Sequence, residues 1–285
     1  MKTEFKDAPL TNSLGGHRIA FLGAGKMAEA LVKGLVGSGQ ILPECITASD
    51  RHPENSKRLA TRYGIHAAPD NLACVSGATL VILAIKPQEL AGVVTQIAPH
   101  LSSEVLVVSV AAGVTTERIE QLLNRPIRVI RSMPNTGAMV GQSATALSMG
   151  KNARAEDLIA AQAIFEAVGR VVVVDEIHLD AVTGLSGSGP AYIFLIIEAM
   201  TDAGVKVGLS REIAQLLSVQ TLLGAAHMLL ETGEHPARLK DQVTSPGGTT
   251  IAGLHTLEAG GLRTTLMDAV EAATLRSREL GKSGA

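Results

Sequence analysis

The residues from Gly23 to Ala28 have the spacing of a phosphate-binding turn. They read Gly-Ala-Gly-Lys-Met-Ala, follow the apolar run Arg18 to Leu22, and open a helical pattern over Lys26 to Val36. In such a pattern the first glycine permits a tight turn, the second lets the backbone approach a pyrophosphate, and the small third residue allows close helix packing. The helix N-terminus then offers free N–H groups to the phosphates. The pattern therefore predicts a dinucleotide-binding turn made of Gly23, Ala24, Gly25, Lys26 and Met27.

The residues after the second predicted strand, Ile46 to Ser49, decide which dinucleotide binds. Asp50 can accept hydrogen bonds from a ribose 2′-hydroxyl, which favours NAD, whereas Ser49, Arg51 and His52 are candidates to hold a 2′-phosphate, which favours NADP. A purely structural alternative is that Asp50 caps a helix beside a solvated Arg51. We expect NADP as the cofactor, with NADPH preferred and NADH accepted.

Further cofactor contacts are expected where other predicted strands end, because ligands of open α/β sheets bind beyond the carboxyl ends of the strands. The strands Leu80 to Ile85 and Val105 to Val110 lead into such junctions. Asn135 and Thr136, after the strand Arg128 to Ile130, are candidates to reach the nicotinamide. The junction residues expected at the cofactor are Asn71, Ala84, Ile85, Lys86, Pro87, Ala111, Ala112 and Gly113.

Two loops rich in glycine, serine and proline, Leu185 to Tyr192 and Asp241 to Ile251, each open a helix in the second half of the chain. In the second loop a glycine pair precedes Thr249 and Thr250 at the helix start. Hydroxyls and unpaired N–H groups at a helix N-terminus together form a receptor for a carboxylate. The alternative is a capped turn between two helices.

The elements that position these residues alternate between short strands and helices up to about Asp175. The strands are apolar throughout, which is typical of a parallel sheet covered by helices on both faces, and an antiparallel sandwich would show alternation instead. We therefore predict an α/β fold, with a doubly wound Rossmann-type parallel sheet over residues 17–177. Residues 1–16 are expected to form a loose tail, with no secretory signal. The remaining predicted strands are Ala144 to Leu147 and Val171 to Val174, and Arg154 to Val168 is a further helix.

From His178 onward alanine, leucine, methionine and glutamate dominate, and no β-branched run stands alone. Residues 178–285 are therefore predicted to be an all-helical domain. The segment Tyr192 to Met200 is apolar on nearly every helical face, and a domain of about 100 residues has limited room to bury such a helix by itself. We expect this domain to be a dimerisation domain.

The composition excludes several classes of protein. At 285 residues and 46% apolar residues the chain is long enough for about two globular domains. The 25 basic and 27 acidic residues nearly cancel, and no Trp is present, so nucleic-acid and membrane partners are disfavoured. Cys45 and Cys74 supply neither a disulfide framework nor a metal site. No apolar run approaches the ~20 residues of a membrane span, so we expect a cytoplasmic protein.

The chain resembles the pyrroline-5-carboxylate reductases over nearly its whole length. The resemblance rests on Gly23 to Ala28, Ala84 to Pro87, Ser109 to Thr115, Met133 to Thr136, Leu185 to Tyr192 and, most specifically, Leu239 to Thr250. It implies reduction of 1-pyrroline-5-carboxylate to L-proline with NADPH or NADH, the last step of proline biosynthesis. It also implies an interlocked dimer, which in many members assembles further into a pentamer of dimers.

The same resemblance assigns roles at the substrate. The backbone N–H groups of Gly248, Thr249 and Thr250 bind the substrate carboxylate, the Thr250 hydroxyl contacts the ring nitrogen as the catalytic group, and Gln242 lies near the cofactor ribose. The Asp50-Arg51 pair and the tail to Gly16 depart from several family members.

Two other functions fit parts of the pattern. The β-hydroxyacid dehydrogenases use a lysine and an asparagine shortly after a Gly-Ser-Gly turn, but counting from Gly187 these positions hold Ile193 and Ile196, which transfer no proton. A non-catalytic NADPH-binding redox sensor has no need of a carboxylate receptor.

Overall fold

The computed structural model describes residues 14–283, and it consists of two compact units. The first reaches to Gly187 and takes in the chain again from Ala273, and the second is Ser188–Ala272. The predicted division into 1–16, 17–177 and 178–285 stays a prediction, and most of the predicted tail lies outside the described residues.

An eight-stranded sheet forms the centre of the first unit in the described part of the chain, in the order β3-β2-β1-β4-β5-β6-β7-β8. The six strands β1 to β6 pair in parallel, with β1 between β2 and β4, so that Ile19 lies opposite both Ile46 and Leu80. The strands are β1 (Ile19–Leu22), β2 (Ile46–Ser49), β3 (His66–Ala67), β4 (Leu80–Leu83), β5 (Leu106–Ser109), β6 (Arg128–Met133), β7 (Ser143–Met149) and β8 (Gly169–Val173). The predicted doubly wound fold is confirmed, and β3 is the strand too short to leave a sequence pattern.

One strand pair departs from the parallel arrangement, because β7 runs antiparallel to β6. Only a short 3-10 segment, Thr136–Val140, occupies the connection between them. A parallel return requires a crossover of a dozen or more residues, so this connection leaves the antiparallel pairing as the available one.

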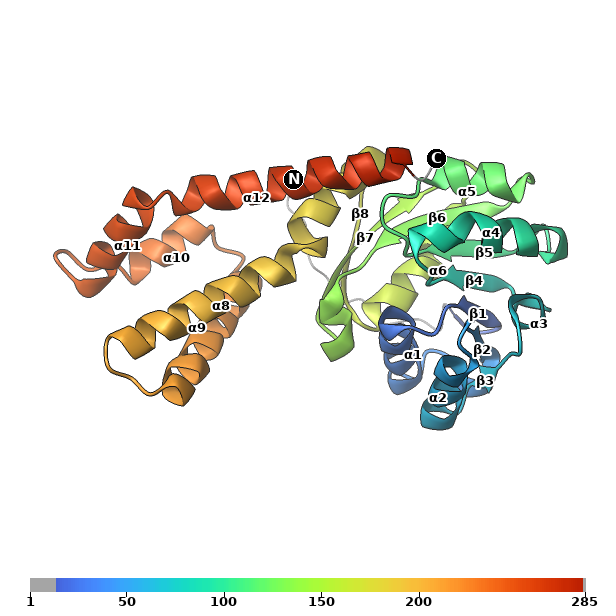
Figure 1. Cartoon of the computed structure of the whole chain (residues 1–285), viewed down its shortest axis with the longest axis horizontal. Helices are drawn as coiled ribbons and strands as arrows, with labels where there is room; N and C mark the ends of the chain where they lie inside the picture. Colours follow the sequence, from blue (N-terminus) through green and yellow to red (C-terminus); the bar gives the residue numbers. More distant parts are fainter. Residues whose placement is uncertain (1–13, 284–285) are drawn as a thin grey trace. The chain divides into compact units, whose positions relative to one another are not determined.

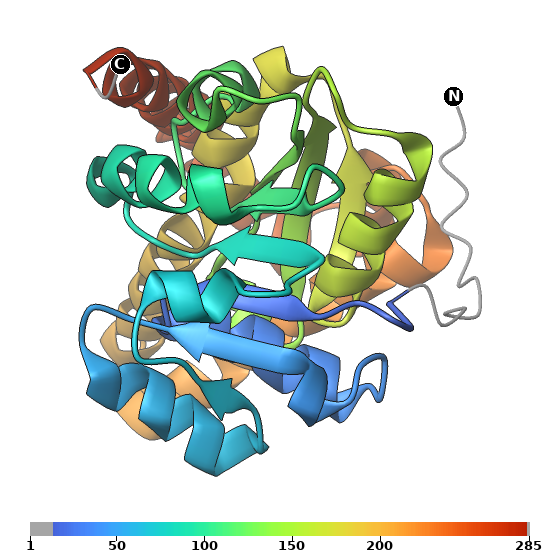
Figure 2. The same ribbon diagram turned by 90° about the vertical axis from the view of Figure 1, so that its right-hand side faces the viewer.

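Helices cover both faces of the sheet (Figures 1 and 2). One face packs under α1 (Lys26–Gly37), α2 (Pro53–Tyr63) and α6 (Ala155–Glu166), with Phe21 and Phe165 fully buried between the layers. The opposite face packs under α3 (Asn71–Val75), α4 (Pro87–Ile97) and α5 (Thr116–Leu123). Because successive strand residues point to opposite faces, Ile19 and Phe21 belong to the first core and Ala20 and Leu22 to the second.

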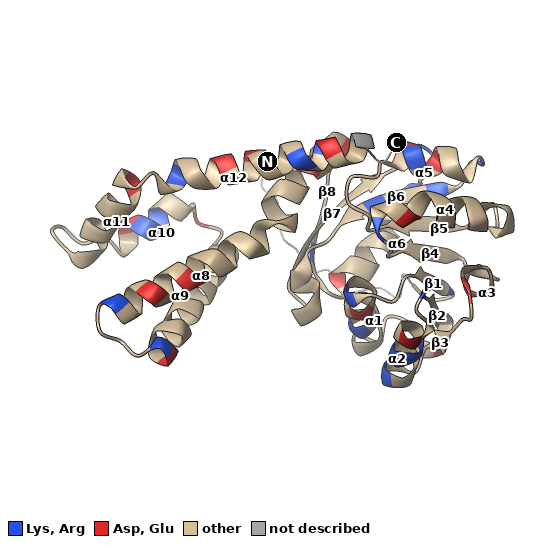
Figure 3. Cartoon of the chain, viewed as in Figure 1, with Lys and Arg blue, Asp and Glu red and all other residues tan. Residues whose placement is uncertain are grey.

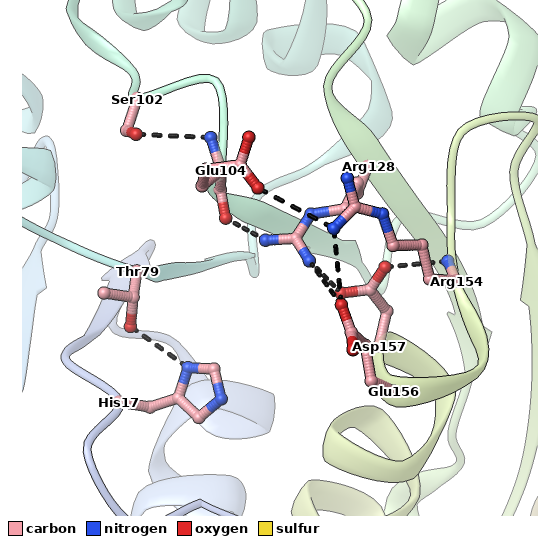
Figure 4. A network of polar contacts seen from close by, with 8 residues as sticks. All are labelled: His17, Thr79, Ser102, Glu104, Arg128, Arg154, Glu156 and Asp157. Carbon is pink, nitrogen blue, oxygen red and sulfur yellow. Dashed lines mark hydrogen bonds and ion pairs between the residues drawn. The ribbon is translucent and has the colours of Figure 1, made fainter.

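Polar contacts gather at the amino ends of several strands (Figure 4). The Arg128 guanidinium contacts the Asp157 carboxylate at 2.8 Å and donates to the backbone carbonyl of Glu104. Nearby, His17 Nδ1 lies 3.0 Å from the Thr79 hydroxyl. The His17 contact joins the starts of β1 and β4, and the Arg128 contacts join β6 to the segment before β5 and to the first turn of α6.

The remaining helices are largely exposed in the single chain, and several of them are rich in apolar residues. They are α7 (Leu179–Val182), α8 (Gly189–Lys206), α9 (Arg211–Thr232), α10 (Pro236–Gln242), α11 (Thr249–Ala259) and α12 (Leu262–Ser283). No charged residue occurs in α9 between Ile213 and Leu230, and Figure 3 shows α8 and α9 largely without charge. Phe194 and Leu216 are 67% and 68% exposed. The segment Leu185 to Tyr192, expected as a loop, is instead a π-helical turn, Thr183–Gly187, that runs into α8.

Two helical segments of the described chain, Glu176–Lys206 and Arg211–Thr232, are long and apolar enough to cross a membrane by length and composition alone. Uninterrupted apolar runs in these helices stay short, as expected, because single charged or polar residues divide them. The mean hydropathy of a long helix stays high nevertheless, and for this reason both helices meet the length and composition of a span.

Candidate active site

Position 23 requires glycine for two reasons, its backbone conformation and the close approach of the Ala84 carbonyl. Gly23 has a φ of +98°, and a Cβ there would lie 2.3 Å from the carbonyl oxygen of Ala84. The Gly23 N–H donates to the Ser49 carbonyl at 2.9 Å, and the Ala84 N–H donates to the Leu22 carbonyl at 2.8 Å. The ends of β1, β2 and β4 thus meet at this residue, and any side chain would force them apart.

The N-terminus of α1 is open to a ligand. Its N-cap residue Gly25 provides no side-chain hydrogen bond, and no atom lies within 4 Å of the position that a Gly25 Cβ would take. Lys26 is exposed and Met27 half-buried. The acidic residue of the first turn, Glu29, faces α2, where Arg62 binds it at 2.8 Å. The helix end therefore offers backbone N–H groups with no carboxylate competing for them, which fits a pyrophosphate.

Asp50 holds the glycine-rich turn in place. Its carboxylate accepts hydrogen bonds from the Ala24 N–H at 2.8 Å, the His52 N–H at 2.9 Å and the Asn55 side chain at 3.2 Å. Partial burial acts to raise the pKa of Asp50, but these hydrogen bonds outweigh it and hold the pKa below its usual value. Asp50 is not the cap of α2, whose N-cap residue is His52, and its carboxylate instead joins the glycine-rich turn to the loop before α2.

Ser49 and Asn71, both expected at the cofactor, are brought together by the structure. The buried Ser49 hydroxyl donates to Asn71 Oδ1 at 2.9 Å, and Asn71 Nδ2 donates to Gln96 at 3.2 Å. The contact connects the end of β2 with the start of α3. Both side chains already have partners within the chain.

Arg51 makes an ion pair that the sequence did not reveal. Its guanidinium binds the carboxylate of Glu89, in the first turn of α4. The sequence did hold a signal for a carboxylate at this helix start. Glu89 closely follows Pro87, and acidic residues are enriched in the first turn of a helix. That turn follows β4, so the pair connects the ends of two strands.

The remaining predicted cofactor residues lie at the same edge of the sheet. Ile85 is half-buried and Lys86 and Pro87 are exposed at the start of α4, where Lys86 is the N-cap residue. The loop after β5 begins at Ala111, whose N–H donates to the Ser109 hydroxyl at 3.2 Å. This loop continues through the half-buried Ala112 to Gly113, which has a φ of +74°.

A buried polar network that the sequence did not indicate supports this edge. Arg131 on β6 is 4% exposed and contacts Glu176 at 3.2 Å. The Glu176 carboxylate accepts from the Thr116 N–H and hydroxyl at 2.7 and 2.6 Å, at the start of α5. On α7, Asp180 accepts from the Ser277 hydroxyl of α12 at 2.7 Å. The network fastens the C-terminal helix to the sheet.

The Asn135 side chain, expected to reach the nicotinamide, makes hydrogen bonds within the chain instead. Its Oδ1 accepts from the Gly137 N–H at 3.0 Å, and its Nδ2 donates to the Ser186 carbonyl at 3.0 Å. The amide thus caps the 3-10 segment and anchors the π-helical turn.

The candidate carboxylate receptor lies in the second unit, at the start of α11. Gly247 has a φ of +68°, and Gly248, the N-cap residue, provides no side-chain hydrogen bond to the helix. Thr249 is exposed and Thr250 half-buried, and no cap side chain bonds the first N–H groups of α11. The Gly248 N–H, also expected at the carboxylate, donates to the Ser245 carbonyl at 3.1 Å. Gln242, the last residue of α10, is exposed. A hollow of about 560 Å³ adjoins this loop, bordered by Lys240, Gly248 and His255.

The fold and the open glycine-rich turn define a dinucleotide-dependent oxidoreductase. Residues 18–113 match the family described as NADP oxidoreductase, coenzyme F420-dependent, and residues 176–280 match the family of pyrroline-5-carboxylate reductase dimerisation. The pyrroline-5-carboxylate reductase of Methanosarcina acetivorans is 50% identical over 93% of this chain and 98% of its own, and that of Arabidopsis thaliana is 47% identical over 93% and 96%. The chain belongs to the pyrroline-5-carboxylate reductase family.

Solved structures agree with this assignment. The pyrroline-5-carboxylate reductase of Coxiella burnetii is 40% identical, with a TM-score of 0.88 over 93% of this chain and 98% of its own. A pyrroline carboxylate reductase of Plasmodium falciparum, solved with NADP bound, is 31% identical, with a TM-score of 0.84 over 93% of this chain and 98% of its own.

The family assignment also accounts for the exposed apolar helices. The matched dimerisation region contains α8 and α9, which expose large apolar side chains in the single chain. The chain therefore self-associates through this region, and a partner chain, rather than lipid, is the expected cover for residues such as Phe194 and Leu216.

Proposed function

We propose that this protein reduces 1-pyrroline-5-carboxylate to L-proline with a nicotinamide dinucleotide as hydride donor. The observation that carries the proposal is the open N-terminus of α1 behind Gly23, in a chain whose relatives at 45–50% identity are named for this reaction.

The reaction places modest demands on the protein. The carbon of the C=N bond accepts a hydride and the nitrogen carries a proton, so a protonated imine taken from solution needs no strong general acid in the site. The protein must bind the carboxylate, orient the ring nitrogen and hold the dinucleotide. When bound, the reduced nicotinamide supplies the hydride.

The nucleotide is held by the first unit. The N–H groups at the start of α1 are placed for the pyrophosphate, with Gly25 leaving open space in front of them. Arg51 is the exposed cation that follows β2, the position at which nicotinamide dinucleotides are distinguished. This arrangement supports NADPH as the preferred cofactor and NADH as an accepted one.

The substrate is held by the second unit. The N–H groups of Gly248, Thr249 and Thr250 bind the carboxylate in this proposal. Those of Thr249 and Thr250 have no side-chain partner from the N-cap, and that of Gly248 must exchange its 3.1 Å bond to the Ser245 carbonyl for the ligand. The Thr250 hydroxyl contacts the ring nitrogen, and Gln242 contributes to the cofactor ribose.

A complete site requires two copies of the chain in this proposal. The nucleotide unit of one subunit combines with the helical unit of its partner in an interlocked dimer, and such dimers can assemble further into a decamer. The protein acts in the cytoplasm.

The test is a spectrophotometric assay of the purified protein with NADPH and 1-pyrroline-5-carboxylate, with proline identified among the products. We expect NADPH oxidation that depends on the substrate and yields proline in equal amount. NADPH binding without turnover would support the redox-sensor alternative instead, and oxidation of a 3-hydroxy acid with NADP would support the dehydrogenase alternative.

A further inference from the structure

We propose that Glu89 limits the preference of this enzyme for NADPH over NADH, because it holds Arg51 in an ion pair that a 2′-phosphate must share or replace. The proposal rests on the proposed function and deepens it. It assigns a specificity role to a residue outside the expected cofactor set.

The position of the pair follows from the strand order. In the sheet β2 and β4 flank β1, and the strand order reverses between β1 and β4. Ligands of such sheets bind in the crevice at this switch point, beyond the carboxyl ends. Arg51 follows β2 and Glu89 lies in the first turn of the helix after β4. The ion pair therefore crosses the carboxyl end of β1, where the glycine-rich turn begins.

Of Asp50 and Arg51, the two charged residues that follow β2, Arg51 is the one that can bind a ligand. Asp50 is committed to the Ala24 and His52 N–H groups. Arg51 contacts His52 Nε2 at 3.1 Å through Nε and Glu89 through Nη1. The Arg51 side chain is 62% exposed and that of Glu89 34% exposed, so solvent and ligands have access to the pair.

The two cofactors differ at one group, and that group is charged. A 2′-phosphate carries about −1.5 to −2 charges near neutral pH, whereas the 2′-hydroxyl of NADH carries none. If Arg51 binds the phosphate, Glu89 must release the guanidinium or share it. With NADH the ion pair can persist. Glu89 therefore weakens NADPH binding selectively and narrows the preference that Arg51 provides.

The test is Glu89→Gln, which keeps the size and removes the charge. Dissociation constants of NADPH and NADH are measured by fluorescence titration at low ionic strength, together with those of adenosine 2′,5′-bisphosphate and 5′-AMP as fragments. Because the ion pair is exposed to solvent, we expect the Glu89→Gln variant to bind NADPH and the bisphosphate about three- to tenfold more tightly than the wild type does. NADH and 5′-AMP should change by less than about twofold, since they carry no 2′ charge.

Two further variants separate this role from a structural one. Glu54→Gln removes an equal charge from the first turn of α2, where Glu54 faces His52 rather than Arg51, and should leave the NADPH to NADH ratio unchanged. In an Arg51→Ala background, Glu89→Gln should lose most of its effect on NADPH.

The outcomes distinguish the proposal from its alternatives. If Glu89 only stabilises the first turn of α4, Glu89→Gln lowers the melting temperature and shifts both cofactors alike, which would overturn the proposal. An unchanged ratio in a well-folded variant would overturn it too. Failure of the proposed function appears differently, as a wild-type protein that binds NADPH but does not oxidise it with 1-pyrroline-5-carboxylate.

Discussion

Gly281, in the last turn of α12, lies directly against the backbone of Gly113. A Cβ on Gly281 would lie 2.7 Å from the Gly113 carbonyl oxygen, and a Cβ on Gly113 would lie 3.3 Å from the Gly281 nitrogen. One turn earlier, the Ser277 hydroxyl donates to Asp180 at 2.7 Å. The C-terminal helix is therefore docked on the loop after β5, which is one of the loops expected to border the cofactor.

Gly281→Ala should destabilise the protein, although glycine to alanine within a helix ordinarily stabilises. The added methyl group meets a backbone carbonyl, which cannot rotate away, so we expect a loss of about 1–3 kcal/mol in the free energy of unfolding. NADPH affinity should fall as well, because the loop at Gly113 must move. Urea unfolding and NADPH titration measure the two effects.

Gly92→Ala is the matched control for that substitution. Gly92 lies inside α4, and no atom is within 4 Å of its Cβ position. We expect a gain of up to about 1 kcal/mol. Equal effects of the two substitutions would contradict the docking described for Gly281.

Asp50→Asn should weaken NADPH and NADH to the same extent. The neutral amide is a weaker acceptor for the Ala24 and His52 N–H groups, so the glycine-rich turn loosens whichever cofactor is bound. Arg51→Ala, in contrast, should weaken NADPH far more than NADH. Paired dissociation constants for the two variants decide this, and a loss confined to NADH in Asp50→Asn would make Asp50 a ribose ligand instead.

The same carboxylate gives an acid-dependent contribution to stability. Since the folded pKa of Asp50 is lower than its ordinary value of 3.8, the folded state binds its proton less readily than the unfolded state. The contribution is therefore present above that value and is lost as the pH falls through the folded pKa. Asp50→Asn should accordingly flatten the acid side of the stability profile.

These residues show what the sequence could and could not predict. The turn at Gly23 was predictable because its spacing is dictated by backbone geometry, and the strands were predictable because burial on both faces leaves continuous apolar runs. The partner of Arg51 was not predictable, since Glu89 is far away along the chain and only the strand order brings it close. The antiparallel β7 is a consequence of connection length rather than of strand composition.

Lowering the pH should destabilise the protein through His17. Burial lowers the pKa of His17 first, the charge of Arg128 lowers it further, and Asp157 partly opposes them. A folded pKa below the ordinary 6.5 means that neutral His17 is favoured in the folded state. The stability that neutral His17 contributes is thus fully present above pH 6.5 and is lost as the pH falls through the lower, folded pKa.

His17→Asn tests this contribution, because asparagine keeps a polar atom near the Thr79 hydroxyl without titrating. Unfolding free energies are measured from about pH 7.5 to about pH 5. The wild type should lose more stability over this range than the variant. Parallel profiles would show that His17 titrates normally in the folded protein.

Thr250→Ala should lower turnover and leave NADPH affinity nearly unchanged. A hydrogen bond that tightens on a charged group in the transition state contributes about ten- to a hundredfold in rate. Thr256→Ala, six residues further along α11, is the control, since the Thr256 hydroxyl donates to the Ala252 carbonyl of its own helix. Equal turnover in wild type and Thr250→Ala would remove the hydroxyl from the mechanism.

Separating the subunits should abolish activity. The single chain exposes Phe194, Leu195, Leu216 and Leu217 on α8 and α9 by half or more, a surface too apolar to stay in water. Burial of this surface in the dimer stabilises the folded chain, so unfolding should shift to higher denaturant as protein concentration rises.

Leu216→Glu tests the role of this surface directly. Leu216 is 68% exposed in the single chain, so the charge should leave the subunit fold intact while it opposes burial against a partner. Leu42→Glu is the matched control, an equally drastic change at a leucine that is 62% exposed in the first unit. Sedimentation should show smaller, inactive species for Leu216→Glu and wild-type assembly for Leu42→Glu. An active species near 29.6 kDa would mean that one chain contains a complete site.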